Sequence, residues 1–123
     1  MSTRKKYVLI AEDEAFLAEM MGKVLTANGV SVAIAHNGKD AVQAMKKRVP
    51  DLLFLDLLMP VLDGYGVLRA MREQGIDCPV IVVSNLTDTM TRNTCKEMRV
   101  KEYLVKSDMD AKLLWPAVKK YLK

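Results

Sequence analysis

Four ionisable side chains directly follow short apolar segments, and their types suit metal and phosphoryl chemistry. Glu12 and Asp13 follow one such segment, Asp56 follows another and Lys106 follows a third. A charge at the end of a buried strand is costly unless something pairs with it or reacts at it. Three acids and one amine in equivalent positions therefore predict a single functional site.

The acids among these residues indicate a metal site. Carboxylates that are held together repel one another, so they need protons or a cation, and an all-oxygen ligand set favours Mg²⁺ or Mn²⁺ over zinc. Glu12, Asp13 and Asp56 contribute three negative charges and Lys106 contributes one positive charge. One divalent ion would balance the net negative charge that remains.

Asp56 is the better candidate for a nucleophile, because it is a single acid at the centre of the cluster. A carboxylate next to Mg²⁺ can attack phosphorus while the metal and an ammonium neutralise the transferring group. Lys106 could supply this ammonium, and the hydroxyl of Ser84 could donate a further hydrogen bond to the transferring group. Taken singly, these residues have structural alternatives. Asp56 and Ser84 could be helix caps, and the acids Glu12-Asp13-Glu14 could lie in the first turn of a helix. Lys106 could be a solvated edge lysine.

The elements that position these residues follow a βα repeat, because five apolar segments alternate with segments of helical periodicity. The expected strands lie at about 7–11, 31–35, 52–56, 80–84 and 102–105, and the expected helices at about 14–28, 38–48, 64–74 and 88–98, with a final helix that carries Leu114, Val118, Tyr121 and Leu122. Pro116 lies well past the capping candidates Asp108 and Asp110, so we expect this last helix to be kinked or to begin near Trp115.

The fold class that follows is α/β. We expect a flavodoxin-like three-layer sandwich, with a five-stranded parallel sheet of order 2-1-3-4-5 and five helices. The third and fourth strands are apolar at consecutive positions, as in central strands covered on both faces. This order places the first strand beside the third, so the carboxylates of Asp13 and Asp56 should converge.

Length and composition narrow the remaining possibilities. At 123 residues the chain fits one domain, and no apolar segment approaches the roughly 20 residues of a membrane span. The apolar segment at 7–11 is too short for a signal peptide, so we expect a cytoplasmic protein without a membrane partner. The net charge of +4 is spread along the chain without a nucleic-acid reading motif, so we expect no direct nucleic-acid partner.

With these residues in place, the chain resembles the response-regulator receiver domains of two-component signalling over residues 1–123. Glu12-Asp13 is similar to the acidic pair of that family, and Pro50–Gly64 is similar to its phosphoacceptor strand and the loop behind it. Ser84 occupies the hydroxyl position of the family and Lys106 its lysine position. The resemblance is closest to single-domain receivers of the chemotaxis type.

The resemblance implies a phosphorylation site and its cofactor. Asp56 would accept a phosphoryl group from a phosphohistidine of a sensor histidine kinase or a histidine phosphotransfer protein. Asp13, Asp56 and the backbone carbonyl of Leu58 would bind Mg²⁺, with Glu12 assisting through water. The chain would catalyse its own phosphorylation and dephosphorylation, and it would not be an enzyme that acts on a separate substrate.

The resemblance also implies how the signal leaves the site. Ser84 and Lys106 would close on the new phosphoryl oxygens. Tyr103 resembles the aromatic switch that then turns inward, although an aromatic residue on an edge strand can also pack on the surface without switching. The face formed by the fourth helix, the fifth strand and the fifth helix would bind a protein target, and Arg92, Lys96 and Arg99 suggest that this target is acidic.

Two residues near Asp56 depart from the family pattern, and two leucines lie at positions that affect access of water. Asn85 stands where a small residue is usual, and its side chain could narrow access to Asp56 or add a hydrogen bond there. Ser107 stands where a proline usually follows the lysine in a cis peptide, and a cis bond before a non-proline residue costs about 2.5–4 kcal/mol. We therefore expect the loop after Lys106 to be arranged differently. Leu58 and Leu86 flank the path of hydrolytic water and offer it no hydrogen bond, so we expect a long-lived phosphorylated form.

Several functions remain open at this point. With no room for an attached output domain, the chain should bind a partner or act as a phosphorelay intermediate that passes its phosphoryl group to a histidine phosphotransfer protein. A phosphatase with an aspartyl-phosphate intermediate would normally need an acid at position 58, where Leu58 stands. A phosphate-independent pseudo-receiver would not need the intact set of acids, hydroxyl and lysine. A flavin module is disfavoured, because the acidic residues 12–14 would repel a phosphate.

Overall fold

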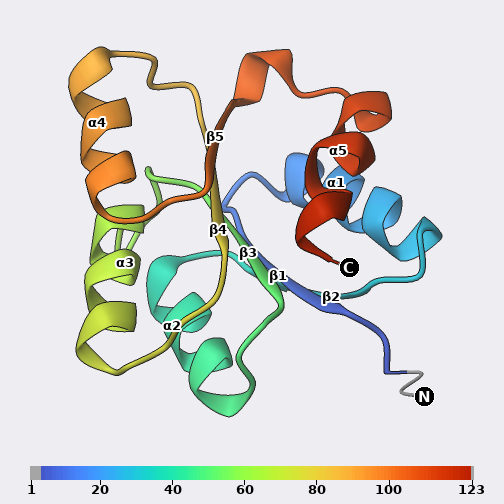
Figure 1. Cartoon of the computed structure of the whole chain (residues 1–123), viewed down its shortest axis with the longest axis horizontal. Helices are drawn as coiled ribbons and strands as arrows, with labels where there is room; N and C mark the ends of the chain where they lie inside the picture. Colours follow the sequence, from blue (N-terminus) through green and yellow to red (C-terminus); the bar gives the residue numbers. More distant parts are fainter. Residues whose placement is uncertain (1–3, 123) are drawn as a thin grey trace.

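The computed structural model describes residues 4–122 as five strands and five α-helices that alternate along the chain (Figure 1). The strands are β1 (Tyr7–Ala11), β2 (Ser31–Ala35), β3 (Leu52–Leu55), β4 (Val80–Ser84) and β5 (Glu102–Val105), and the helices are α1 (Ala15–Ala27), α2 (Gly38–Lys47), α3 (Gly64–Glu73), α4 (Thr89–Glu97) and α5 (Ala111–Val118). Short 3₁₀ turns, η1 (Lys106–Asp108) and η2 (Lys119–Tyr121), precede and follow α5.

All neighbouring strands are parallel, and their order in the sheet is β2-β1-β3-β4-β5, as the sequence predicts. Strand β3 ends one residue earlier than expected, so Asp56 lies just beyond it. Strands β3 and β4 are buried along their whole length, whereas the edge strands β2 and β5 are mostly half-buried. The uninterrupted apolar runs of β3 and β4 are therefore explained by helices on both faces.

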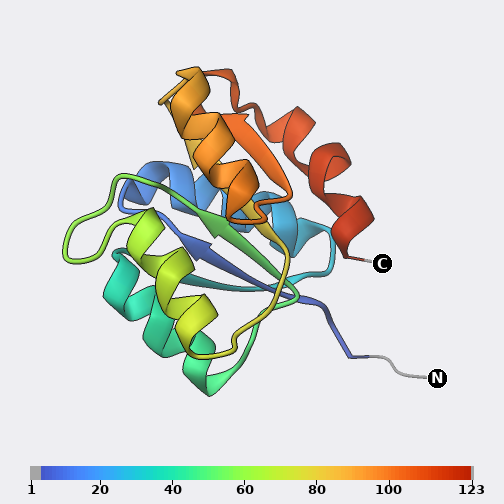
Figure 2. The same ribbon diagram turned by 60° about the vertical axis from the view of Figure 1, so that its left-hand side comes forward.

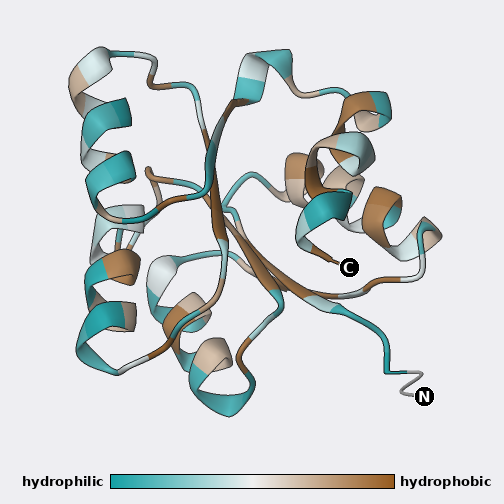
Figure 3. Ribbon diagram, in the orientation of Figure 1, coloured by the Kyte–Doolittle hydropathy of each residue, from teal (hydrophilic) through white to brown (hydrophobic). Residues whose placement is uncertain are grey.

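Helices cover the sheet in two layers, which confirms the three-layer sandwich. Helices α2, α3 and α4 pack on one face, and α1 and α5 pack on the other (Figures 1 and 2). Alternate residues of β1 serve the two cores, since Leu9 faces the first and Ile10 the second. Hydrophobic residues are accordingly concentrated on the strands and on the helix faces against them (Figure 3). Among the described residues, no helix is both long and apolar enough to cross a membrane.

Helix α5 begins earlier than one sequence alternative allowed. The carboxylate of Asp110 accepts a hydrogen bond from the Lys112 amide at 2.8 Å, and the helix starts at Ala111, so the start near Trp115 is wrong. Pro116 lies inside the helix, which changes to the 3₁₀ turn η2 after Val118. The aspartate cap starts the helix five residues ahead of the proline, whose missing N–H removes only one backbone hydrogen bond.

The loop between β3 and α3 has a strained backbone. Val61 has a φ of 70°, and the Leu62 amide donates a hydrogen bond to the Pro60 carbonyl at 2.8 Å across a three-residue turn. A β-branched residue rarely adopts this conformation. Directly after the turn, the Asp63 carboxylate accepts a hydrogen bond from the Gly66 amide at 2.8 Å and caps α3. The strained turn therefore joins the end of β3, next to Asp56, to the start of α3.

Candidate functional site

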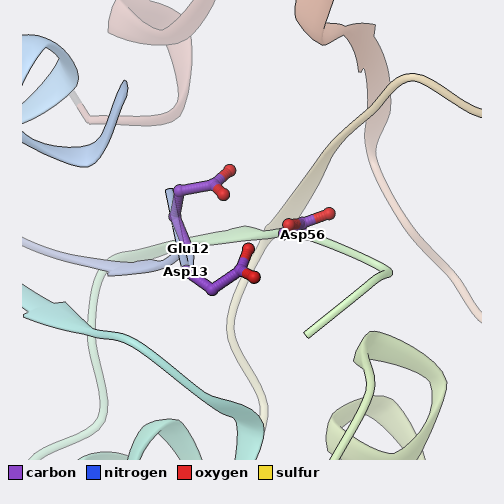
Figure 4. Close-up of side chains that lie close together, drawn as sticks. All are labelled: Glu12, Asp13 and Asp56. Atoms are coloured by element: carbon purple, nitrogen blue, oxygen red, sulfur yellow. The ribbon is translucent and has the colours of Figure 1, made fainter. Parts of the chain in front are cut away.

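The sheet brings the three predicted acids together at its carboxyl edge. Glu12 and Asp13 follow β1 and Asp56 follows β3, and these strands are neighbours in the sheet. The Asp56 amide donates a hydrogen bond to the Ala11 carbonyl at 3.0 Å, which fixes the two strand ends in register. One carboxylate oxygen from each acid lies within 4.8 Å of the others (Figure 4). Three clustered oxygen ligands suit a hard divalent cation such as Mg²⁺.

Burial raises the pKa of two of these acids. Glu12 and Asp56 are each only 2% exposed, whereas Asp13 is exposed to solvent. Burial raises the pKa of Glu12 to about 7, although hydrogen bonds from the Glu14 amide and the Lys106 ammonium act in the opposite direction. Burial likewise raises the pKa of Asp56, although the hydrogen bonds from Lys106 and from the Leu58 amide lower it. The cluster therefore stabilises bound protons or cations.

Lys106 lies inside this cluster and contacts three carboxylates. Its Nζ atom is 2.9 Å from Asp56 Oδ2, 3.0 Å from Glu12 Oε2 and 2.9 Å from Glu14 Oε2, and its side chain is 10% exposed. Burial would lower the pKa of the Lys106 ammonium, but the hydrogen bonds with Asp56, Glu14 and Glu12 outweigh burial and raise it. The alternative of a solvated edge lysine is wrong.

Glu14 is a member of the site that the sequence did not single out. Its backbone precedes α1, and its carboxylate makes no capping hydrogen bond to that helix. The carboxylate instead reaches Lys106. The only sequence signal is its position directly after the acidic pair, which is equally typical of an acid in the first turn of a helix.

Neither Asp56 nor Ser84 caps a helix. Asp63 caps α3 and Asp88 caps α4, so the capping alternatives for Asp56 and Ser84 are wrong. Asp56 Oδ1 accepts a hydrogen bond from the Leu58 amide at 3.1 Å, two residues further along the chain. The buried Ser84 Oγ accepts one from the Leu86 amide, also at 3.1 Å. Each side chain thus organises the loop that follows its own strand.

Tyr103 does not simply pack on the surface. Its half-buried side chain donates a hydrogen bond from the hydroxyl to the Leu86 carbonyl, which lies in the loop after Ser84. The Arg92 guanidinium lies over the Tyr103 ring, 4.7 Å from its centroid. Burial raises the pKa of the Tyr103 hydroxyl. Tyr103 therefore links β5 to α4 and to the loop after β4.

The two departures from the family pattern, Asn85 and Ser107, and the two leucines lie in the segments that follow β3, β4 and β5. Leu58 is 61% exposed and Leu86 is half-buried. The Ser107 amide donates a hydrogen bond to Asn85 Oδ1 at 2.9 Å. Between residues 4 and 122 no peptide bond is cis, so the bond after Lys106 is trans and leads into the 3₁₀ turn η1. Serine in place of proline thus gives an all-trans loop.

The fold and the site define the class to which this protein belongs. A model of the response regulator receiver domain matches residues 8–117, and the chain belongs to that family. Members of the family generally bind Mg²⁺. The acid cluster described above would suit that ion.

Individual proteins show the same relationship. The chain is 36% identical over 106 residues to a probable transcriptional regulator, ycf27, of Pyropia yezoensis, a match that covers 86% of this chain and 43% of the relative. It is similar to the receiver domain of Francisella response regulator 1452, with 28% identity, a TM-score of 0.88 and coverage of 96% and 97% of the two chains. The Vibrio cholerae chemotaxis protein CheY4 shares the fold, with a TM-score of 0.88, 23% identity and coverage of 97% and 100%. The chain thus spans less than half the length of the curated ycf27 relatives to which it is similar.

Proposed function

We propose that this receiver domain accepts a phosphoryl group on Asp56 from a phosphohistidine of a sensor histidine kinase. The observation that supports this most strongly is the ion pair of 2.9 Å between Lys106 Nζ and Asp56 Oδ2, inside a cluster of acids suited to a divalent cation. A nucleophile, a phosphate-binding cation and candidate metal ligands therefore lie within one another's reach.

In the proposed reaction, an oxygen of the Asp56 carboxylate attacks phosphorus. The new O–P bond forms as the P–N bond to the donor imidazole breaks, and the imidazole nitrogen keeps the electron pair. Lys106 neutralises charge on the phosphoryl oxygens, and the Ser84 hydroxyl donates a hydrogen bond to one of them. Glu12, Asp13, Asp56 and the Leu58 carbonyl would hold Mg²⁺, or Mn²⁺, which when bound adds positive charge beside the same oxygens.

The signal would then reach a protein target through the α4–β5–α5 face. Tyr103 is suited to the switch because it already joins Arg92 of α4 to the Leu86 carbonyl behind Ser84. An acidic target surface would complement the basic α4 region. We expect this output in the cytoplasm, either through such a target or by relay to a histidine phosphotransfer protein.

The rival functions have weaker support. A phosphatase would need an acid to protonate its leaving group, and the corresponding side chain is Leu58. We therefore propose that the chain catalyses only its own phosphorylation and dephosphorylation. A pseudo-receiver would have no use for Lys106 among three carboxylates, which is a costly arrangement to bury without a function.

One experiment separates receiver from phosphatase and also tests the expected lifetime. Treated with acetyl phosphate and Mg²⁺, the protein should become phosphorylated without turning over p-nitrophenyl phosphate.

After removal of the donor, Leu58→Asn should lose phosphate about tenfold faster than wild type, because one hydrogen bond to the attacking water is worth about 1.4 kcal/mol. Leu113→Asn is the matched control, since Leu113 is 62% exposed and lies on α5. Rapid wild-type hydrolysis, or steady turnover of the nitrophenyl ester, would contradict the proposal.

The raised pKa of Glu12 predicts how Mg²⁺ affinity depends on pH. In the metal-free protein Glu12 holds a proton below about pH 7, so the cluster gains a negative charge as the pH rises through that value. Calorimetric titration should therefore show Mg²⁺ binding that is about tenfold weaker at pH 6 than at pH 8. Glu12→Gln should remove most of this pH dependence, and Asp13→Asn should weaken binding at both pH values. Equal affinity of wild type at the two pH values would contradict the prediction.

A further inference from the structure

A single hydrogen bond joins two of the residues in which this chain departs from its family pattern. The Ser107 amide donates to Asn85 Oδ1 at 2.9 Å. A proline at position 107 would have no amide hydrogen to donate, and alanine or glycine at position 85 would have no side-chain oxygen to accept it. The bond therefore requires both an amide hydrogen at position 107 and a side-chain acceptor at position 85.

This bond lies between the two residues that are proposed to contact the phosphoryl group. Asn85 directly follows Ser84, and Ser107 directly follows Lys106. The ladder between β4 and β5 ends at the pair Ser84 and Val105, so the bond continues the connection of the two strands beyond their last paired residues. It therefore ties the residue that follows Ser84 to the residue that follows Lys106.

Lys106 gains most from such a connection. Its ammonium reaches carboxylates that follow β1 and β3, while its backbone begins the short turn η1 directly after the edge strand β5. Strand β5 lies at the edge of the sheet, so β4 is its single neighbouring strand. Asn85 and Ser107 are both exposed to solvent. A specific bond at this point limits how far the Lys106 backbone can move away from Ser84.

We propose that Asn85 is a positioning residue for phosphorylation of Asp56, and that it acts through the Ser107 amide to hold Lys106 and Ser84 as one preassembled pair. The proposal rests on the phosphoacceptor function proposed above. It differs from the idea that Asn85 acts through its size, by narrowing access to Asp56. The two ideas predict different behaviour when both ends of the bond are changed.

A double-mutant cycle tests the proposal. The initial rate of phosphorylation by acetyl phosphate with saturating Mg²⁺ is measured by intact mass for Asn85→Ala, Ser107→Pro and the double variant. Each single change should lower the rate about fivefold, as expected for one hydrogen bond, and the double variant should be no slower than either. Ser107→Ala keeps the amide donor and should match wild type, and Asn85→Asp keeps an acceptor oxygen and should restore part of the rate.

Two further measurements keep the outcome clear. Amide hydrogen exchange at Ser107 should be faster in Asn85→Ala than in wild type, which does not require the proline variant to fold, and melting curves check the fold of every variant. Multiplicative rate losses in the double variant, unchanged exchange at Ser107, or a wild-type rate in Asn85→Ala would overturn the role of Asn85. Absence of Asp56 phosphorylation in wild type would instead overturn the underlying function.

Discussion

Replacement of Lys106 by methionine should slow phosphorylation of Asp56 by acetyl phosphate by at least about 100-fold, the usual effect of removing a charge that stabilises a transition state. The methionine side chain is of similar length but carries no charge to neutralise the phosphoryl oxygens. Mg²⁺ should still bind, and more tightly than in wild type, because Glu12, Glu14 and Asp56 lose the cation that they share. Phosphorylation rates and calorimetric Mg²⁺ titrations on the same samples measure the two effects.

Two variants serve as controls for that result. Lys101→Met removes the charge of an exposed lysine just before β5 and should leave phosphorylation unchanged. Lys106→Arg keeps the charge but changes the shape of the donor group, so it should retain part of the activity. A Lys106→Met protein that is phosphorylated at a rate close to wild type would show that the ion pair with Asp56 has no part in the chemistry.

Gly38→Ala should lower the free energy of unfolding by about 3 kcal/mol, at the upper end of the cost of overpacking a core. A Cβ atom at Gly38 would lie 2.1 Å from the Leu62 carbonyl oxygen and 2.8 Å from the carbonyl carbon. These are backbone atoms, so no side-chain rotation relieves the clash. Either α2 or the strained loop between β3 and α3 must move. Urea denaturation measures the change.

Gly22→Ala is the matched control for this variant. Gly22 lies within α1, where an added Cβ would be 3.7 Å from Val32 and 3.8 Å from Ile34, at ordinary contact distances. Alanine also favours a helix by about 1 kcal/mol over glycine, so this change should be neutral or stabilising. If Gly38→Ala unfolds at the same urea concentration as wild type, α2 is not packed against the loop at Leu62 as described.

Much of the fold could be predicted because the signals are local and periodic. Continuous apolar runs identify β3 and β4, and helical spacing identifies α1 to within a residue at each end. The convergence of Asp13 with Asp56 followed from strand order alone, since parallel strands end at one edge of the sheet. Residues that directly follow strands were therefore predicted to lie together, and three of the acids do so.

The features that were not predicted depend on loops and on how far side chains reach. Glu14 looked like an acid at a helix start, and only the position of the Lys106 ammonium shows that the two meet. The pairing of Asn85 with Ser107 needs both loop backbones in place before it can be seen. The start of α5 was uncertain because Pro116 argues against a helix, while the cap at Asp110 determines where the helix begins.

The central claim is that Asp56 is a phosphoacceptor, and intact-mass measurement tests it most directly. Wild type and Asp56→Asn are each incubated with acetyl phosphate and Mg²⁺, with a parallel sample that contains a metal chelator. We predict that wild type gains the mass of one phosphoryl group only when Mg²⁺ is present, and that Asp56→Asn gains none. A wild-type protein that stays unmodified, or an Asp56→Asn protein that is modified to the same extent, would contradict the claim.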